Sequence, residues 1–307
     1  MIRHKWALIG FLCVWFACFQ SALVHADNPA PKTVEQVYPG LAVGMLKKAQ
    51  LVPLKKGTLL VTRGLQIKAS QLNAKVEAAD PSIRAELRRN LFFLLEQEAV
   101  QAMLVQEARS SKSVEKDLSD TEAIRAYLDQ KFQGVEVSEA EAKAFYEANK
   151  AMVQGMPFEQ VKETIQQVLV QQKRQDAFAS YLQDLGEDRA IQVNAEWVGD
   201  RYALAMDNPV DRARRSGKPT MVEFGATGCV PCDMMQPVLE KLRKKFPDAL
   251  NVVFVHVGEN RLLGARFGIR SIPVQVFYDK TGQEVFRHVG FFAEEKILKQ
   301  LTALGVT

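Results

Sequence analysis

Cysteine and histidine are scarce in this sequence, with four of each among 307 residues. Two of the cysteines, Cys13 and Cys18, lie in an apolar leader, which leaves Cys229 and Cys232 as the pair in the rest of the chain. One pair cannot cross-link a disulfide-rich scaffold, and it cannot supply the four soft ligands of a structural zinc site. Two cysteines separated by two residues therefore favour redox chemistry.

The sequence also lacks a long apolar run and a dense basic tract. The apolar run from Trp6 to Phe19 spans about 14 residues, whereas a transmembrane helix needs roughly 20. Basic residues precede this run and small residues follow it up to Ala26, which predicts a cleaved secretory signal over residues 1–26 and a periplasmic location. A retained membrane anchor is the alternative. The net charge of +4, without a basic tract that interleaves aromatic residues, gives no support to a nucleic-acid partner.

After the leader, the chain has the length of two domains. Residues 27–56 are rich in proline, lysine and small residues, and they predict a linker or a loosely ordered segment. A strand pair is predicted over residues 57–65, and the pattern that follows, as far as residue 200, is mostly helical. Alternation over residues 190–198 predicts an edge strand at the end of this first part.

Capping residues mark several helix starts in the first part. Asp80 followed by Pro81 predicts an N-cap and a first helical residue, and Ser138 with Glu141 forms a capping box. Apolar residues at helical spacing predict a long helix over residues 158–186. This part has no cysteine and no cluster of metal ligands, so its sequence favours a packed helical bundle.

Two helical segments, residues 137–150 and 157–173, resemble the chaperone module of SurA-type periplasmic foldases. In that family a prolyl-isomerase domain commonly separates such segments, but here only residues 151–156 lie between them, so isomerase activity is not implied. The resemblance implies a client-binding cradle over residues 57–200. Burial in a core, or dimerisation of the helices, is the alternative use of its apolar residues. The residues expected to contact clients are Phe92, Phe93, Met103, Met152 and Met156.

The second part is organised around the cysteine pair. Residues 220–226 predict a buried strand, the motif Gly228-Cys229-Val230-Pro231-Cys232 follows, and residues 233–246 predict a helix. The predicted order of elements as far as the C-terminal helix is β-α-β-α-β-β-α. The remaining strands are predicted over 251–257, 274–278 and 284–289, and the remaining helices over 261–267 and 294–304.

This order and its motifs resemble thioredoxin over residues 203–306. The resemblance implies a multi-domain chain, in which a mostly α-helical SurA-like domain precedes an α/β thioredoxin-fold domain over residues 201–307. The dithiol chemistry of that family needs no cofactor and no metal. The residues that support the resemblance are Val222-Glu223-Phe224, Cys229-Val230-Pro231-Cys232, Pro237, Phe267-Gly268-Ile269-Arg270, Ile272-Pro273 and Val289-Gly290.

The resemblance implies a role for each of the matching residues. Cys229, at the helix start, is the expected nucleophile, because free backbone N–H groups and the helix dipole stabilise its thiolate. Cys232 is the expected resolving thiol, and Glu223 stands where the family has a buried aspartate that relays a proton to or from it. Pro273 matches the cis-proline of the family. The residues expected to bind substrate are Ile272, Val230 and Pro231.

Two aromatic residues that are usual in the family are glycines in this sequence. Gly228 stands just before the first cysteine and Gly225 in the preceding strand, which predicts a more open and flexible rim around the dithiol. The Val-Pro dipeptide between the cysteines is similar to that of exported reducing thioredoxins of the TlpA kind. His256, on the neighbouring strand, is a weaker candidate for a charge partner of the dithiol.

The predicted function is that of an exported thiol–disulfide oxidoreductase, a reductase or an isomerase that acts on protein disulfides. Its expected partners are proteins with disulfides or unfolded segments and a membrane-bound electron donor, and its helical domain binds clients or dimerises. The alternative is a periplasmic chaperone whose thioredoxin-like domain mainly recognises clients.

Overall fold

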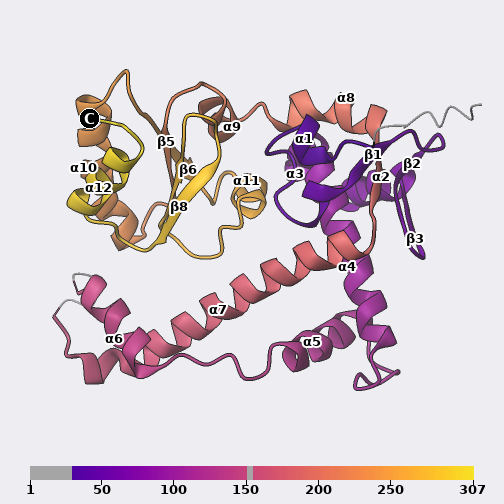
Figure 1. Cartoon of the computed structure of the whole chain (residues 1–307), viewed down its shortest axis with the longest axis horizontal. Coiled ribbons are helices and arrows are strands. Elements are labelled where there is room, and N and C mark those ends of the chain that lie inside the picture. Colours follow the sequence, from indigo (N-terminus) through magenta and orange to yellow (C-terminus); the bar gives the residue numbers. More distant parts are fainter. Residues whose placement is uncertain (1–29, 151–154) are drawn as a thin grey trace, which may run out of the picture. The chain divides into compact units, whose positions relative to one another are not determined.

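A computed structural model of the chain describes residues 30–150 and 155–307 (Figure 1). The expected signal, residues 1–26, lies outside the described residues. No helix within these described ranges is both long enough and apolar enough to cross a membrane. The described residues include two four-stranded sheets, each with its own hydrophobic core.

The first sheet has the strand order β1-β4-β2-β3. Strands β2 (Thr58–Thr62) and β3 (Leu65–Lys68) form an antiparallel hairpin, as the sequence predicts. The predicted edge strand over residues 190–198 is wrong, because β4 (Gln192–Asn194) lies inside the sheet, parallel to β1 (Gln50–Val52) and antiparallel to β2. The chain then turns into helix α8 (Ala195–Ala205), which the Asn194 side chain caps.

The expectation of a loose linker is also wrong for the described part of residues 27–56. This segment forms α1 (Val34–Val37), the 3-10 helix η1 (Met45–Lys48) and β1. Its apolar side chains belong to the core of the first sheet, where Val34 and Leu46 are fully buried. The buried carboxylate of Glu96 accepts the backbone N–H groups of Val43, Gly44 and Leu46 at 3.2, 3.0 and 2.9 Å. Burial raises the pKa of Glu96, and these three hydrogen bonds oppose that rise.

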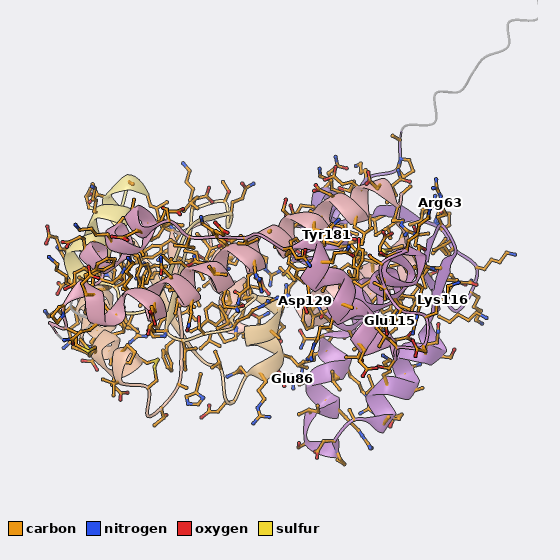
Figure 2. All side chains as sticks on the ribbon, turned by 90° about the horizontal axis from the view of Figure 1, so that it is seen from below. Arg63, Glu86, Glu115, Lys116, Asp129 and Tyr181 are labelled. Carbon is orange, nitrogen blue, oxygen red and sulfur yellow. A yellow bond between two sulfur atoms is a disulfide. The ribbon has the colours of Figure 1, made fainter. Side chains whose placement is uncertain are left out.

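Six longer helices complete the first part. Asp80 and Ser138 cap their helices as predicted, the latter through a capping box with Glu141. Tyr127 on α5 (Asp120–Lys131) and Tyr181 on α7 (Phe158–Asp188) join the two helices through their hydroxyl groups, 2.9 Å apart. The Tyr181 side chain is labelled in Figure 2. The helices are α2 (Ala69–Ala78), α3 (Pro81–Arg89), α4 (Leu91–Ser110), α5 (Asp120–Lys131), α6 (Glu139–Ala148) and α7 (Phe158–Asp188).

The second sheet has the strand order β6-β5-β7-β8. Strand β5 (Thr220–Gly225) is parallel to β6 (Asn251–His256) and antiparallel to β7 (Val274–Tyr278), which pairs in turn with β8 (Glu284–Val289). The predicted order β-α-β-α-β-β-α is confirmed. The associated helices are α9 (Pro209–Arg214), α10 (Val230–Lys245), α11 (Arg261–Arg266) and α12 (Glu294–Ala303).

Alternation along β5 assigns its side chains to the two faces of the second sheet. Met221 packs with Leu239 of α10 and Ile297 of α12, whereas Val222 packs with residues of α9 and α11. Side chains two residues apart on a strand point to the same face. Glu223 and Gly225 therefore lie on the face that α10 covers, the helix that begins at the cysteine pair.

Candidate active site

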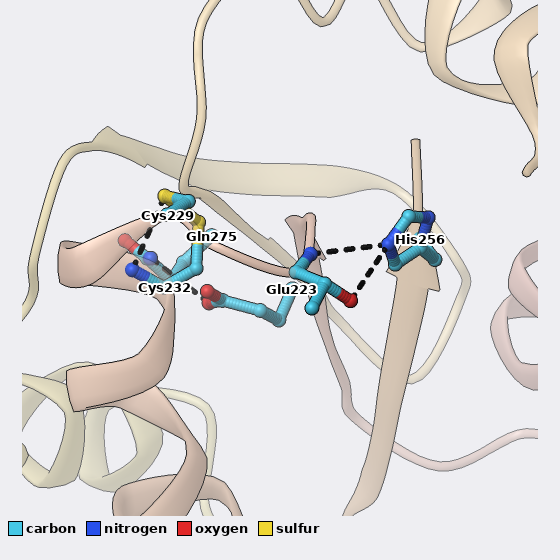
Figure 3. Close-up of a disulfide and its surroundings, with 6 residues drawn as sticks. Glu223, Cys229, Cys232, His256 and Gln275 are labelled. Carbon is cyan, nitrogen blue, oxygen red and sulfur yellow. Dashed lines mark hydrogen bonds between the residues drawn. A yellow bond between two sulfur atoms is a disulfide. The ribbon is translucent and has the colours of Figure 1, made fainter. Parts of the chain in front are cut away.

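The cysteine pair occupies the start of α10, where it forms a disulfide (Figure 3). Cys229 is the N-cap residue, and its sulfur accepts the backbone N–H of Cys232 at 3.3 Å. Cys229 is half-buried, whereas Cys232 is only 1% exposed. The outer sulfur is therefore the one that an incoming disulfide can reach, and the inner sulfur is shielded by the protein.

A buried carboxyl and a buried amide lie beneath the disulfide. Glu223 on β5 and Gln275 on β7 are cross-strand partners, and neither side chain has any exposed surface. The Nε2 group of Gln275 donates a hydrogen bond to Oε2 of Glu223 at 2.9 Å (Figure 3). Burial raises the pKa of Glu223 to about 8, and the hydrogen bond from Gln275 opposes this rise. Glu223 thus holds its proton at neutral pH and remains able to release it.

Gly225 brings the backbone of β5 against the inner cysteine. A Cβ atom at Gly225 would lie 3.4 Å from Sγ of Cys232 and 3.0 Å from Cε2 of Phe254 on β6. The ring of Phe254 therefore occupies the space into which a side chain at Gly225 would extend. Close packing around Sγ of Cys232 excludes water from the inner sulfur.

The structure places Pro273 where the sequence predicts it, at the start of β7 and opposite the end of β5. The Ile272–Pro273 peptide bond is cis, and the Pro273 carbonyl accepts the backbone N–H of Gly290 at 2.8 Å. Pro273 is buried and Ile272 is half-buried. Among the residues expected to bind substrate, Val230 is the most open, at 66% exposed, and Pro231 is half-buried.

His256 supports the loop that leads to Cys229. Its Nε2 atom lies 3.1 Å from the backbone nitrogen of Thr227 and 3.2 Å from the Thr227 hydroxyl (Figure 3). Nδ1 is buried without a hydrogen-bond partner among the described residues, and the nearest carboxylate is Glu259 at 3.9 Å. The hydrogen bonds of His256 therefore go to the loop, and they hold the backbone two residues before the outer cysteine.

Within residues 30–150 and 155–307, no group of three or more histidine, cysteine or carboxylate side chains is placed to hold a metal ion. The site consists instead of a disulfide-bonded cysteine pair, one carboxyl group and one amide.

Residues 203–303 match the family model for thioredoxin. The chain is 36% identical over 95 residues to the thioredoxin of Alicyclobacillus acidocaldarius subsp. acidocaldarius, which covers 31% of this chain and 90% of the relative. It is 34% identical over 98 residues to thioredoxin H4 of Arabidopsis thaliana, covering 32% of this chain and 82% of the relative. The chain belongs to the thioredoxin family. With its cysteine pair at the start of α10, the thioredoxin domain is a protein-disulfide oxidoreductase.

A longer match extends beyond the thioredoxin domain. The chain is 33% identical over 134 residues to the chloroplastic thioredoxin-like protein HCF164 of Oryza sativa subsp. japonica, which covers 43% of this chain and 51% of the relative. The SurA-like character of residues 57–200 is not tested by these matches and stays a prediction.

Two residues of the site were missed by the sequence reasoning. Gln275 follows Pro273 by two positions in a strand that is otherwise apolar, and a polar residue in such a strand was the available signal. Phe254 lies in a run of β-branched and aromatic residues that predicts only a buried strand. Its place beside Cys232 depends on the pairing of β5 with β6.

Proposed function

We propose that this protein is an exported reductase or isomerase of protein disulfides, with an N-terminal helical part that engages its clients. The observation that supports this most directly is the stacking of three groups at the start of α10. A half-buried sulfur, Cys229, lies above a shielded one, Cys232, and the buried carboxyl of Glu223 lies on the sheet face below. The proposed nucleophile, resolving thiol and proton acceptor therefore follow one another in space from the surface inwards.

In the first step, the Cys229 thiolate attacks one sulfur of a client disulfide. A bond forms between Sγ of Cys229 and that sulfur, the client S–S bond breaks, and the other client sulfur leaves as a thiolate that takes a proton from water. The free N–H groups of the first turn of α10 stabilise the attacking thiolate. The N–H of Cys232, which points at Sγ of Cys229, is one of these.

In the second step, Cys232 resolves the mixed disulfide. Its thiol gives its proton to the Glu223 carboxylate, its sulfur bonds to Sγ of Cys229, and the client leaves as a second thiolate. The client gains two electrons and the protein dithiol becomes the disulfide. A pKa of about 8 leaves about one tenth of Glu223 ionised at pH 7, which is enough to accept this proton. In the reverse direction the acid protonates the departing Cys232, as an isomerase requires.

The surface around Cys229 suits a protein client. Val230 is 66% exposed and Met234, one turn further along α10, is 44% exposed, so both offer apolar contact beside the nucleophile. The half-buried Ile272 offers its backbone to an extended client strand. Among the described residues, nothing would lie within 4 Å of a Cβ at Gly228, so the position just before the outer cysteine is open. A membrane-bound electron donor would then return the disulfide to the dithiol.

The role of the helical part rests on fewer residues than the sequence suggests. Phe92 and Met103, expected among the client contacts, are fully buried in the core and cannot reach a client. Met152 lies outside the described residues. Phe93 is half-buried, and the exposed apolar side chains of the first part include Met156, at 45%, and Val168 on α7, at 49%. Such side chains remain available for clients or for dimerisation.

The exposed apolar side chains of Met156 and Val168 favour a second candidate function, a chaperone that recognises clients with little redox turnover. Cys229→Ser separates the two functions, with Cys232→Ser as the matched control. For an oxidoreductase, Cys229→Ser abolishes the reduction of insulin disulfides, whereas Cys232→Ser retains the client as a mixed disulfide that mass spectrometry detects. Turnover that survives Cys229→Ser contradicts the nucleophile assignment. Unchanged suppression of client aggregation, together with no measurable insulin reduction by the wild type, favours the chaperone.

A further inference from the structure

Gln275 is the fully buried amide whose partner is a titrating carboxyl. It lies directly opposite Glu223 in the register of β5 and β7, so both side chains point to the face that α10 covers. Its Nε2 group donates to Oε2 of Glu223, whereas its own Oε1 and the Oε1 of Glu223 have no hydrogen-bond partner among the described residues. A buried polar atom without a partner is costly, so both oxygens call for a functional explanation.

The amide group of Gln275 can serve both protonation states of a carboxyl. Its NH₂ group donates to a carboxylate, and its carbonyl accepts from a carboxylic acid. A half-turn about the last bond of Gln275 exchanges these two groups without moving the rest of the side chain. The unpartnered Oε1 of Gln275 is the acceptor that a protonated Glu223 would need.

We infer that Gln275 is a positioning residue for proton transfer, which holds the Glu223 carboxyl toward Cys232 and rotates its amide when Glu223 gains or loses the proton. This inference rests on the proposed role of Glu223 in the second step. The proton passes from the thiol of Cys232 to Glu223 as Sγ of Cys232 bonds to Sγ of Cys229. Gln275 itself neither gains nor loses a proton; it changes only from donor to acceptor.

Among the neighbours of Glu223 described below, Gln275 is the one that can form a hydrogen bond with the carboxyl in either protonation state. Glu223 pairs in register with Gln275 on β7 and with Phe254 on β6, and its carboxyl points toward Cys232 at the start of α10 (Figure 3). Phe254 offers no hydrogen bond, and Cys232 is the reacting group. The pKa of Glu223 is raised chiefly by burial, and the Gln275 hydrogen bond is the influence that lowers it. Without this hydrogen bond the ionised form of Glu223 becomes rarer at neutral pH.

The test separates the two chemical steps with dithiobis(nitrobenzoate) and the fully reduced protein. Attack by Cys229 releases one coloured thiolate, and resolution by Cys232 releases the second, so a stopped-flow trace reports each step. Gln275→Met replaces the amide by an unbranched side chain of similar length. We expect the first release to keep its wild-type pH profile. The inflection in the second release should move up by about 1 pH unit, which is tenfold in proton affinity.

Two further variants make the result specific. Gln283→Met, at an exposed position in the turn after β7, is the matched control and should leave both releases unchanged. In the Glu223→Gln background, Gln275→Met should have no additional effect on the pH profile, because Gln275 acts through Glu223. An additional effect in that background would mean a general structural role and would overturn the inference.

The outcomes also distinguish the inference from the proposed function. If Glu223→Gln leaves the second release unchanged, the assignment of Glu223 as proton acceptor fails. If Glu223→Gln slows it but Gln275→Met keeps the wild-type inflection, only the role of Gln275 fails. Should Gln275→Met not fold, the side-chain amide resonances of Gln275 in the wild-type protein decide. They must titrate together with Glu223, and a signal that stays constant from pH 6 to pH 10 overturns the inference.

Discussion

Replacement of Glu223 by glutamine tests the site through stability rather than through turnover. Burial raises the pKa of Glu223 to about 8 in the folded protein, from an ordinary value of 4.5. Below pH 4.5 the carboxyl is protonated in both folded and unfolded chains, so its contribution to stability is fully present there. Between pH 4.5 and pH 8 the unfolded chain releases the proton and the folded chain keeps it, so the free energy of unfolding falls as the pH rises.

The size of this fall follows from the interval of about 3.5 pH units between the two pKa values. At about 1.4 kcal/mol per unit, the wild-type protein loses about 5 kcal/mol through this group, and it loses nothing more once the pH exceeds both pKa values. Glu223→Gln removes the titrating group and preserves its shape. The difference in unfolding free energy, wild type minus variant, should therefore decrease by about 5 kcal/mol from acid to mildly alkaline pH.

The measurement should report on the second sheet alone, because a chain with two cores need not unfold in one transition. Hydrogen exchange of the amides of β5 and β7, followed by mass spectrometry on the oxidised protein, gives a local free energy of opening. Wild type and variant are compared at the same pH, so that the intrinsic exchange rates cancel. A difference that stays constant to within about 1 kcal/mol over the whole range would refute the raised proton affinity of Glu223.

Two other substitutions test the packing around the cysteines. Gly225→Ala should destabilise the oxidised protein by about 1–3 kcal/mol in urea denaturation, because the added methyl group presses on Phe254 and on Sγ of Cys232. Phe254→Leu should recover part of that loss, and a full-sized effect in the double variant would place the strain elsewhere. His256→Phe should cost about 1 kcal/mol by removing the acceptor of the Thr227 N–H, whereas Thr227→Val, which keeps that N–H, should cost less. Equal losses in these two variants would mean that the hydroxyl contact dominates.

The thioredoxin domain could be predicted closely because its local signals agree with its tertiary structure. Buried strands such as β5 are continuous apolar runs, and the cysteine motif coincides with a helix start. In the first part, Asp80 and Ser138 likewise predict helix starts, since a capping side chain bonds within three residues of itself. Such features can be recognised in the sequence without knowing which residues pack against them.

The first sheet could be predicted only in part, because the β2–β3 hairpin is local whereas β1 and β4 pair with strands far away in the sequence. Strand β1 has three residues, too few for an alternation to be recognised, and its partner β4 lies about 140 positions away. The alternation around β4 is recognisable in the sequence, but its place inside the sheet depends on pairing with both β1 and β2. The backbone conformation of residues 41–48 depends on hydrogen bonds to Glu96. In the sequence alone, Glu96 is one more charged residue of a predicted helix. The sequence of a segment does not reveal that its backbone N–H groups donate to a distant buried carboxylate.

The partner of Glu223 lies beyond sequence reasoning for a related reason. The position of Glu223 follows from its distance to the cysteine motif, but Gln275 becomes its partner only through the register in which β5 meets β7. A shift of that register by one residue would place Val274 or Val276 opposite Glu223 and leave its carboxyl without the amide. The proton affinity of Glu223 is then a property of the strand pairing as much as of the residue itself. We expect a different result in a chain with the same cysteine motif and the same glutamate but an apolar residue in place of Gln275. Its glutamic acid should hold the proton more tightly, and the chain should resolve mixed disulfides more slowly at neutral pH.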